Sequence, residues 1–439
     1  MRSSAGKALI GFETELFTLD GEGNAAGRAD MILREAPSNK FSVIKKECAH
    51  SLIEVAGEPE SEVLLSLGHL LGGMETALSL AEKNGMALCP LGTYPGMIAP
   101  RMRTEPRYKI QETIFGTERW RIAGSCAGFH CHHSLPRGIF DTQLRMIKMI
   151  AHLRVKERFV NSYNLMIAAD PALTALTQSS PYYQGKRLGK DARIIMYRGG
   201  KPLANREGLY ANMQVFGGLP HYRPTTLDIF EILSSRYEAW KALLKSLGIN
   251  IKMLSLFGSV LDPSWNPIKV NAHGTLEQRG MDMNHPQHLL AAGSLIKYGL
   301  KMLDSEAYTV RASEIGVSEP FKVEGETIHV PPFSHVRDEL QRKSAYEGLE
   351  NESVLDYSRA FLKMASSLIP PERRKFIAPF KEMLEERRTV SDEILGFAKR
   401  RGAARDRIDQ ALAQEIALRH AGRLRGEIEK AGKVILDLF

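Results

Sequence analysis

Hydrophobic and polar positions alternate over several short stretches up to about residue 330, and this alternation predicts β-strands. The first predicted strand covers residues 8–19 and runs into the turn signal Asp20-Gly-Glu-Gly23. Further strands are predicted over residues 51–56, 86–89, 124–134, 249–257 and 274–279, and a hairpin over residues 321–330.

Between these strands, apolar residues recur at helical spacing. The pattern predicts one helix from Ser61, as its cap, to residue 85, and a second from Asp141, as its cap, to residue 169. A third helix is expected over residues 226–248. Long helices and short strands therefore share the same part of the chain.

From about Val336 the strand pattern stops, and Ile408, Leu412 and Ile416 repeat on one helix face. The sequence therefore predicts a main domain over residues 1–335 and a helical C-terminal region over residues 336–439. Residues 371–439 contain 16 Lys or Arg against 12 Asp or Glu. This excess is explained either by a solvated helical face or by a contact with an acidic partner.

Composition places the chain among ordinary globular proteins. Its 439 residues allow two or three domains, or one large domain with an appendage. The formal net charge of +8 suits an anionic substrate but is too small to establish nucleic-acid binding, so no nucleic-acid partner is expected.

The four cysteines form no Cys-x-x-Cys pair, which argues against a disulfide framework and a zinc ribbon. The N-terminal residues contain no apolar signal core, and no segment approaches the roughly 20 apolar residues of a membrane span. We therefore expect a soluble, cytoplasmic protein.

The first candidate site is Gly11-Phe-Glu-Thr-Glu-Leu-Phe17, in which Glu13 and Glu15 project from the same face of a strand. On a solvated edge this repulsion costs little. If the face is buried, a divalent cation is the natural way to neutralise the two carboxylates. A second acidic pair, Glu47 and Glu54, flanks His50, and Glu54 lies inside an apolar strand pattern.

Histidines dominate the third candidate, Gly128-Phe-His-Cys-His-His133, where His130 and His132 share one strand face. They are either zinc ligands or ordinary histidines with hydrogen-bond partners inside a sheet. In the fourth candidate, Glu277 and Arg279 share a strand face, either as a salt bridge or as part of a metal and phosphate site.

The common nucleotide-binding and hydrolase motifs are absent from the sequence. There is no Gly-x4-Gly-Lys-Ser/Thr loop, no Gly-x-Gly-x-x-Gly after a strand and no Gly-x-Ser-x-Gly. If the protein uses a nucleotide, glutamates from several strands that coordinate Mg²⁺ are an alternative way to hold its phosphates.

Taken in this order, the motifs resemble those of glutamate-cysteine ligase family 2, the carboxylate-amine ligases of the glutamine synthetase superfamily. The resemblance covers Ile10 to about Asp282. It rests on the glutamate, histidine and Glu277-Gln-Arg279 motifs above and on three further segments: residues 91–96, 107–108 and 175–185.

This resemblance implies an α+β fold in which helices flank an antiparallel half-barrel sheet, with a helical region following at the C-terminus. It further implies an ATP-dependent reaction in which a substrate carboxylate becomes an acyl phosphate and an amine then displaces phosphate to form an amide. A γ-glutamyl product is the leading expectation, with small amino acids or amines as substrates and Mg²⁺ or Mn²⁺ as the cation. Whether the protein forms a homo-oligomer stays open.

The same resemblance assigns roles to individual residues. Arg279 would face the transferred phosphate of ATP, and Glu277 would act beside it in catalysis. Metal ligands would be Glu13, Glu15, Glu47, Glu54, His130 and Glu277.

Three positions depart from the family pattern: Thr14 replaces an acidic residue, Tyr94 replaces a histidine, and residues 191–198 differ from a serine-containing stretch. The departures concern the substrate more than the reaction type, because binding loops carry specificity. Arg107, Arg193 and Arg198 are candidates for binding a substrate carboxylate, and each is also explained as a surface residue.

Two other functions fit parts of the sequence. One is a metal-dependent hydrolase that uses His130 and His132 with His221, His273 and Asp282. The other is a non-catalytic binding protein with a basic helical tail. The glutamate-rich motifs favour Mg²⁺ or Mn²⁺ over Zn²⁺, and unpaired buried carboxylates are costly unless a cation is present.

Overall fold

A computed structural model describes residues 8–257, 259–305 and 308–437. One large antiparallel sheet has the strand order β10-β11-β5-β1-β3-β2, and β4 pairs with the end of β1. Its strands are β1 Ile10–Leu19, β2 Ser42–Lys46, β3 Leu52–Gly57, β4 Ala87–Cys89, β5 Gly128–Ser134, β10 Ile268–Asn271 and β11 Thr275–Asp282.

Shorter strands form three small sheets away from the large one. They are the hairpin of β6 Phe140–Asp141 and β7 Met146–Ile147, the hairpin of β8 Tyr182–Tyr183 and β9 Lys186–Arg187, and the sheet of β12 Thr309–Ala312, β13 Val323–Glu324 and β14 Thr327–Val330.

The helices up to residue 318 are α1 Ala29–Glu35, α2 Val63–Lys83, α3 Pro106–Phe115, α4 Thr117–Ala123, α5 Leu153–Leu176, α6 Ala192–Tyr197, α7 Gln214–Gly217, α8 Thr226–Ser246, α9 Pro286–Ser305 and α10 Ile315–Ser318. After residue 340 follow α11 Gln341–Glu347, α12 Glu352–Ser366, α13 Ala378–Glu386, α14 Val390–Arg400 and α15 Gln410–Leu436. Short 3₁₀ turns and a π-helix over His335–Leu340 connect several of them.

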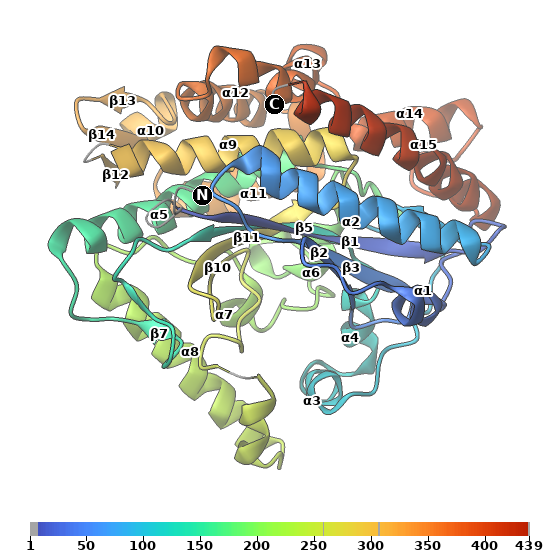
Figure 1. The fold of residues 1–439 in the computed structure, drawn as a ribbon, viewed down its shortest axis with the longest axis horizontal. Helices are drawn as coiled ribbons and strands as arrows, with labels where there is room; N and C mark the ends of the chain where they lie inside the picture. The colour runs from blue at the N-terminus through green and yellow to red at the C-terminus, as the bar shows by residue number, and fades with distance from the viewer. Residues whose placement is uncertain (1–7, 258, 306–307, 438–439) are drawn as a thin grey trace.

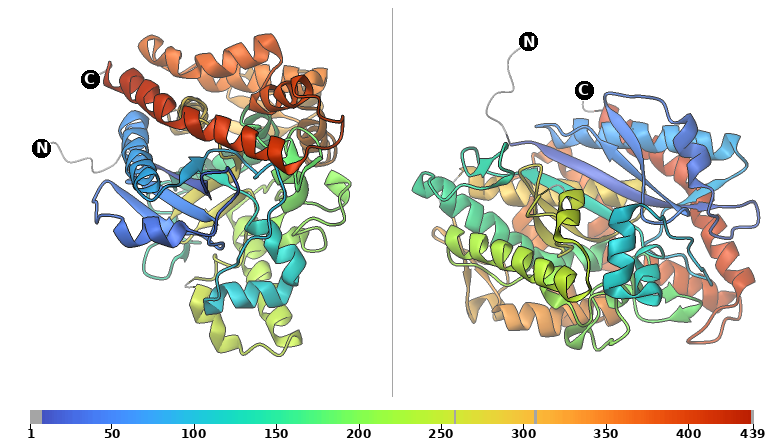
Figure 2. Two further views of the ribbon diagram at one scale, coloured as in Figure 1. Left: turned by 90° about the vertical axis from the view of Figure 1, so that its right-hand side faces the viewer. Right: turned by 90° about the horizontal axis from the view of Figure 1, so that it is seen from below.

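These elements are arranged in layers (Figure 1). Helices α2, α5 and α9 pack on one face of the large sheet, and α12 and α15 pack on the outside of these helices. The opposite face of the sheet looks toward α3, α4 and α8, as the rotated views also show (Figure 2). Helices therefore cover one face of the sheet, and residues of the other face line a cleft.

Strand alternation explains why the two faces differ. In β1, Phe12, Thr14 and Leu16 are buried beneath the helices, whereas Glu13 and Glu15 point to the other face. Apolar burial on the helix-covered face contributes roughly 25 cal/mol per Å² of apolar area removed from water. That face stabilises the fold, and the other is left for polar groups.

Most predicted elements are confirmed, with small shifts at their ends. The strands predicted over residues 8–19, 51–56, 86–89 and 274–279 correspond to β1, β3, β4 and β11, and the hairpin near residue 325 and the helical C-terminal region are also present. The predicted α+β class and antiparallel sheet are also confirmed. Ser61, however, does not cap α2: Glu62 is the N-cap, and it makes no side-chain capping hydrogen bond.

The predicted helix from Asp141 to residue 169 is wrong at both ends. Asp141 instead shapes the β6–β7 hairpin, because its Oδ1 accepts hydrogen bonds from the backbone N–H groups of Gln143 (3.0 Å) and Leu144 (2.9 Å). The helix α5 starts only at Leu153 and continues through Pro171. All its residues from 159 to 176 are buried, so packing on every side outweighs the hydrogen bond lost at the proline.

The strand predicted over residues 249–257 is also wrong, because Ile251–Phe257 form a 3₁₀-helix after α8. Its β-branched and aromatic residues resemble those of a strand, but Gly248 turns the chain sharply with a φ of +69°. The described residues include one helix, α2, that is long and apolar enough to cross a membrane, which the sequence analysis did not expect. In this structure α2 packs on the large sheet, and 56% of its most apolar window is buried.

Candidate active site

The polar face of the large sheet borders a cleft of about 340 Å³. Strands β1, β2, β3, β5, β10 and β11 supply one side of it, and helices α3, α4 and α6 contribute to the other. The lining contains Glu13, Glu15, Glu47, Glu54, His130, Glu277, Arg279, Arg107 and Arg193 from the residues singled out in the sequence. Residues separated by more than 250 positions thus meet in one place.

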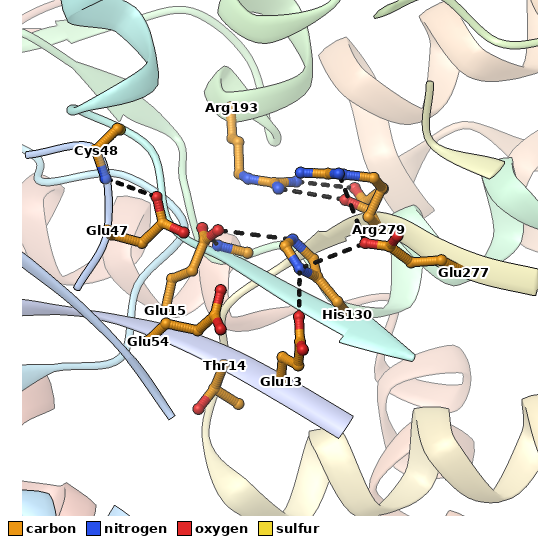
Figure 3. A network of polar contacts seen from close by, with 12 residues as sticks. Glu13, Thr14, Glu15, Glu47, Cys48, Glu54, His130, Arg193, Glu277 and Arg279 are labelled. Carbon is orange, nitrogen blue, oxygen red and sulfur yellow. Dashed lines mark hydrogen bonds and ion pairs between the residues drawn. The ribbon is translucent and has the colours of Figure 1, made fainter. Parts of the chain in front are cut away.

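His130 stands at the centre of this cleft (Figure 3). Its Nδ1 lies 3.7 Å from an oxygen of Glu13 and 3.8 Å from Glu277, and its Nε2 lies 3.7 Å from Glu15. The antiparallel register places Glu13 directly opposite His130 on the neighbouring strand. Burial alone would raise the pKa of Glu13, but the neighbouring imidazoles of His130 and His132 hold it well below its usual value.

Three further carboxylates gather beside this histidine. Glu15, Glu47 and Glu54 each offer an oxygen within 4.8 Å of the others. Backbone N–H groups fix two of them: Gly128 donates to Glu15 (2.6 Å), and Cys48 donates to Glu47 (2.8 Å).

This acidic cluster is electrostatically strained. Burial and the neighbouring charges of Glu15 and Glu54 raise the pKa of Glu47 well above its usual value. Burial and Glu13 raise the pKa of Glu54, although Lys45 lies 3.0 Å away and acts in the opposite direction. A nearby positive charge would relieve this repulsion.

Glu277 and Arg279 form the other end of the polar row. Arg279 approaches Glu277 at 3.6 Å, and Asn271 donates a hydrogen bond of 2.7 Å to the second Glu277 oxygen. Although burial alone would raise the pKa of Glu277, Arg279, His132 and Lys269 lower it to about 2. Glu277 is therefore an anion throughout the neutral range.

The three predicted substrate arginines have different surroundings. Arg107 lines the cleft. Arg193 also lines it and donates hydrogen bonds to the backbone carbonyls of Gly280 (3.2 Å) and Arg279 (3.3 Å), so it supports the strand that carries Arg279. Glycine at residue 128 leaves room for this guanidinium, because a Cβ there would lie 2.3 Å from an Arg193 nitrogen and the guanidinium would have to shift.

Arg198 does not reach the cleft. Its guanidinium is buried and makes a two-pronged ion pair with Asp170, at 2.6 and 2.9 Å, and a hydrogen bond with Gln341. This geometry gives Arg198 a structural partner instead of a substrate carboxylate. The sequence prediction for Arg198 is thus not supported by its position.

Sequence reasoning missed several residues that line the cleft. Tyr108 and Trp120 form an aromatic wall on α3 and α4, and both the indole N–H of Trp120 and an amide oxygen of Gln111 are buried without a partner among the described residues. Lys269 on β10 and the half-buried Asp262 before it also line the cleft. One feature of the sequence could have indicated Lys269: it is a charged residue between two apolar ones, Ile268 and Val270.

The hydrolase constellation is assembled only in part. His130, His132 and His273 line the cleft. His221 instead packs on Phe333, with ring centroids 3.8 Å apart, and Asp282 accepts hydrogen bonds from Ser179 and Ser180.

The donor set fits a hard divalent cation. Within the described parts of the chain, Glu15, Glu47 and Glu54 are the group of potential ligands close enough to share an ion. The ring nitrogen Nε2 of His130 is buried, has no hydrogen-bond partner among the described residues and faces Glu15. Carboxylate oxygens with one imidazole are ligands that suit Mg²⁺ or Mn²⁺.

The family comparison matches residues 9–415 to the description "Glutamate-cysteine ligase family 2(GCS2)". The chain belongs to this family. A Clavibacter sepedonicus protein with the provisional name glutamate–cysteine ligase 2 is 24% identical over 234 residues, which are 50% of this chain and 56% of that protein. A protein of the same name from Clavibacter michiganensis subsp. michiganensis matches to the same extent, so the match spans little more than half the length of these relatives, 56%.

Two solved structures share the fold of this chain. A glutamate–cysteine ligase from Francisella tularensis in complex with AMP has a TM-score of 0.57 and 13% identity, with 98% of this chain and 93% of that chain covered. A bifunctional glutathione synthetase from Pasteurella multocida has a TM-score of 0.52 and 13% identity, with 95% of this chain and 52% of that chain covered. At this identity the likeness concerns the fold alone.

Proposed function

We propose that this protein is an ATP-dependent carboxylate-amine ligase that forms an amide through an acyl phosphate, with a γ-glutamyl product as the leading candidate. One observation carries the proposal: family membership coincides with a cleft in which carboxylates, imidazoles and three arginines converge. Such a donor set suits phosphoryl transfer, which depends on positioning and charge stabilisation and needs no protein nucleophile.

In this proposal Glu13, Glu15, Glu47, Glu54, His130 and Glu277 hold Mg²⁺ or Mn²⁺. The bound cations would supply charge neutralisation for the phosphates of ATP and relieve the repulsion among the carboxylates. The raised pKa of Glu47 and the unpartnered Nε2 of His130 support this role, because a cation bound between these groups would stabilise both.

Arg279 would stabilise the transferring phosphoryl group. Its side chain is 17% exposed, lines the cleft from β11 and is held beside Glu277. Arg193 would orient it through the β11 backbone, since it bonds the carbonyl of Arg279 itself. The amine would then attack the acyl carbon as phosphate leaves, and the narrow polar cleft would limit competing attack by water.

The test is to incubate the protein with ATP, Mg²⁺ and amino acids, singly and in pairs, and to measure ADP and phosphate release. We expect release that requires one carboxylic amino acid and rises with an amine partner. Release that needs glutamate and rises with cysteine would identify the activity for which the family is named. Turnover without ATP that depends on Zn²⁺ would contradict the proposal and favour a hydrolase.

A further inference from the structure

Lys269 is a buried cation at the edge of the cleft. It lies in β10, directly opposite Glu277 of β11, and only 6% of the residue is exposed. Among the described residues its ammonium group makes neither a hydrogen bond nor an ion pair, although Lys45 at the other edge of the sheet binds Glu54 at 3.0 Å. A buried charge without a partner is costly, so a ligand of opposite charge beside Lys269 would stabilise it.

Glu277, the nearest strand neighbour, has its oxygens engaged elsewhere. One accepts a hydrogen bond from Asn271, and the other lies between His130, His132 and Arg279 at 3.6–3.8 Å. Burial lowers the pKa of Lys269 to about 8, so the group is still mostly protonated at neutral pH. Lys269 therefore presents a positive charge to the cleft with no acceptor of its own.

Asp262 supplies the opposite charge in the same part of the cleft. It is half-buried, and burial raises its pKa, while Lys269 and then Arg107 act to lower it. An anion such as phosphate would gain from Lys269 but would be repelled by Asp262. A group that carries both charges gains from both residues, and the head of an α-amino acid is such a group.

We propose that Lys269 and Asp262 bind the α-carboxylate and the α-ammonium of the amino acid whose second carboxylate is activated. This inference rests on the ligase function proposed above. Cross-strand neighbours have Cβ atoms about 4.5–5.5 Å apart. A head group at Lys269 is thus one short side chain away from Glu277, His130 and Arg279, and a distal carboxylate two methylenes along would reach that cluster.

The experiment measures binding by calorimetry with Mg²⁺ and without ATP, using three probes. L-glutamate has both head charges, glutarate lacks the ammonium, and 4-aminobutyrate lacks the α-carboxylate. The wild-type protein should bind L-glutamate most tightly. Lys269→Met should weaken the binding of L-glutamate about 10- to 100-fold, as when a charge-assisted hydrogen bond is lost. It should change the affinity for 4-aminobutyrate less than about twofold.

Asp262→Asn should weaken the binding of L-glutamate by a similar factor and leave the affinity for glutarate nearly unchanged. Lys46→Met is the matched control, because Lys46 lines the same cleft from β2, at the opposite edge of the sheet, and pairs with Glu105. It should alter none of these preferences. Folding is checked independently: Lys269→Met removes a buried unpaired charge, so its melting temperature should be equal to or higher than that of the wild type.

Two results would overturn the inference. One is a Lys269→Met protein that discriminates L-glutamate from 4-aminobutyrate as well as the wild type does. The other is a variant whose only change is a higher KM for ATP, which would assign Lys269 to phosphate. The two proposals can fail separately. If both variants weaken selective L-glutamate binding as expected but no amino-acid pair releases ADP, the head-group site is supported and only the ligase proposal is contradicted.

Discussion

The two faces of the large sheet are built from adjacent residues of the same strands, yet one is apolar and the other is charged. On the helix-covered face, Phe12 and Phe129 stack with ring centroids 5.7 Å apart. One residue further along each strand, Glu13 and His130 face the cleft at 3.7 Å. The comparison teaches that a single residue step separates groups that hold the fold together from groups that carry charge.

The cost of the polar face is visible in its electrostatics. Burial and like charges raise the pKa values of Glu47 and Glu54, and Lys269 has no partner of its own. The helix-covered face contains no comparable group within β1, where Phe12 and Leu16 are buried with the hydroxyl of Thr14. Stability and chemistry are therefore expected to respond to different substitutions.

The largest expected effect is on stability, from Phe129→Ala. Loss of a fully buried ring that stacks on Phe12 should reduce the free energy of unfolding by about 3–5 kcal/mol. Turnover per folded molecule should be unchanged. Denaturant titration and an activity assay on the same preparation measure both quantities. His130→Ala, one residue along, is the matched partner and should show the reverse: lost turnover with little loss of stability.

Arg279→Lys should cause the next largest effect, this time on activity. Lysine keeps the charge but loses the planar fork of donors, so we expect turnover to fall about 10²-fold or more, with a smaller change in nucleotide affinity. The melting temperature should change little, because lysine keeps a positive charge beside the buried Glu277. If the variant is less stable but turns over normally, Arg279 only forms an ion pair with Glu277 and does not contact the phosphate.

The helix-covered side should show a pH effect of its own, between α9 and α15. His285 and His420 are hydrogen-bonded at 2.9 Å, and burial lowers the pKa of His420 to about 4 and that of neighbouring His288 to about 3. Arg423 lowers both pKa values further, whereas Glu393 opposes it.

Because the folded pKa of His420 lies below the unfolded value of about 6.5, its contribution is present above pH 6.5 and is lost as the pH falls toward 4. We expect His420 alone to cost about 2 kcal/mol at pH 5 relative to pH 8. Melting temperatures across this range should fall less steeply for His420→Gln than for the wild type. Equal slopes would show that His420 binds its proton equally well in the folded and unfolded states.

Glu13→Gln or Glu15→Gln tests the polar face at a smaller scale. Each variant should fold normally and lose at least about tenfold in Mg²⁺-dependent turnover, as expected when a metal ligand or its support is removed. Raising the Mg²⁺ concentration should restore part of the loss. Unchanged turnover at both limiting and saturating Mg²⁺ would remove these residues from the metal site.

The smallest expected effect is a gain of stability. In the presence of EDTA, Glu54→Gln removes one of the mutually repelling carboxylates and should raise the unfolding free energy by up to about 1 kcal/mol. Mg²⁺ should then stabilise the wild type more than the variant, as measured by the shift in melting temperature. A variant that is less stable in EDTA would mean that the ion pair with Lys45 outweighs the repulsion.

The sequence predicted the centre of the site because alternation assigns strand faces without knowledge of the fold. Glu13 and Glu15 had to share a face, as did Glu277 and Arg279, and the order of the motifs indicated the family. What alternation could not provide was pairing between strands, which places His130 beside both Glu13 and Glu277.

The missed and misplaced residues have physical reasons too. Lys269 lies in a four-residue strand, Ile268–Asn271, too short to give a periodic signal. Tyr108 and Trp120 lie on helices whose orientation toward the cleft is set by tertiary packing. Arg198 looked like a substrate arginine, but Asp170, its partner, lies on α5 and is 28 positions away in sequence.

The order of the strands in the sheet has a consequence for the time course of synthesis. The pairing of β1 with β3 and β2 requires only the first 57 residues, so Glu13, Glu15, Glu47 and Glu54 can be brought together early. His130 joins them from β5, and Glu277 only once β11 has left the ribosome. A nascent chain can thus pair the strands of its carboxylates long before the guanidinium that completes the row is made, and a chain that ends before residue 275 lacks both Glu277 and Arg279.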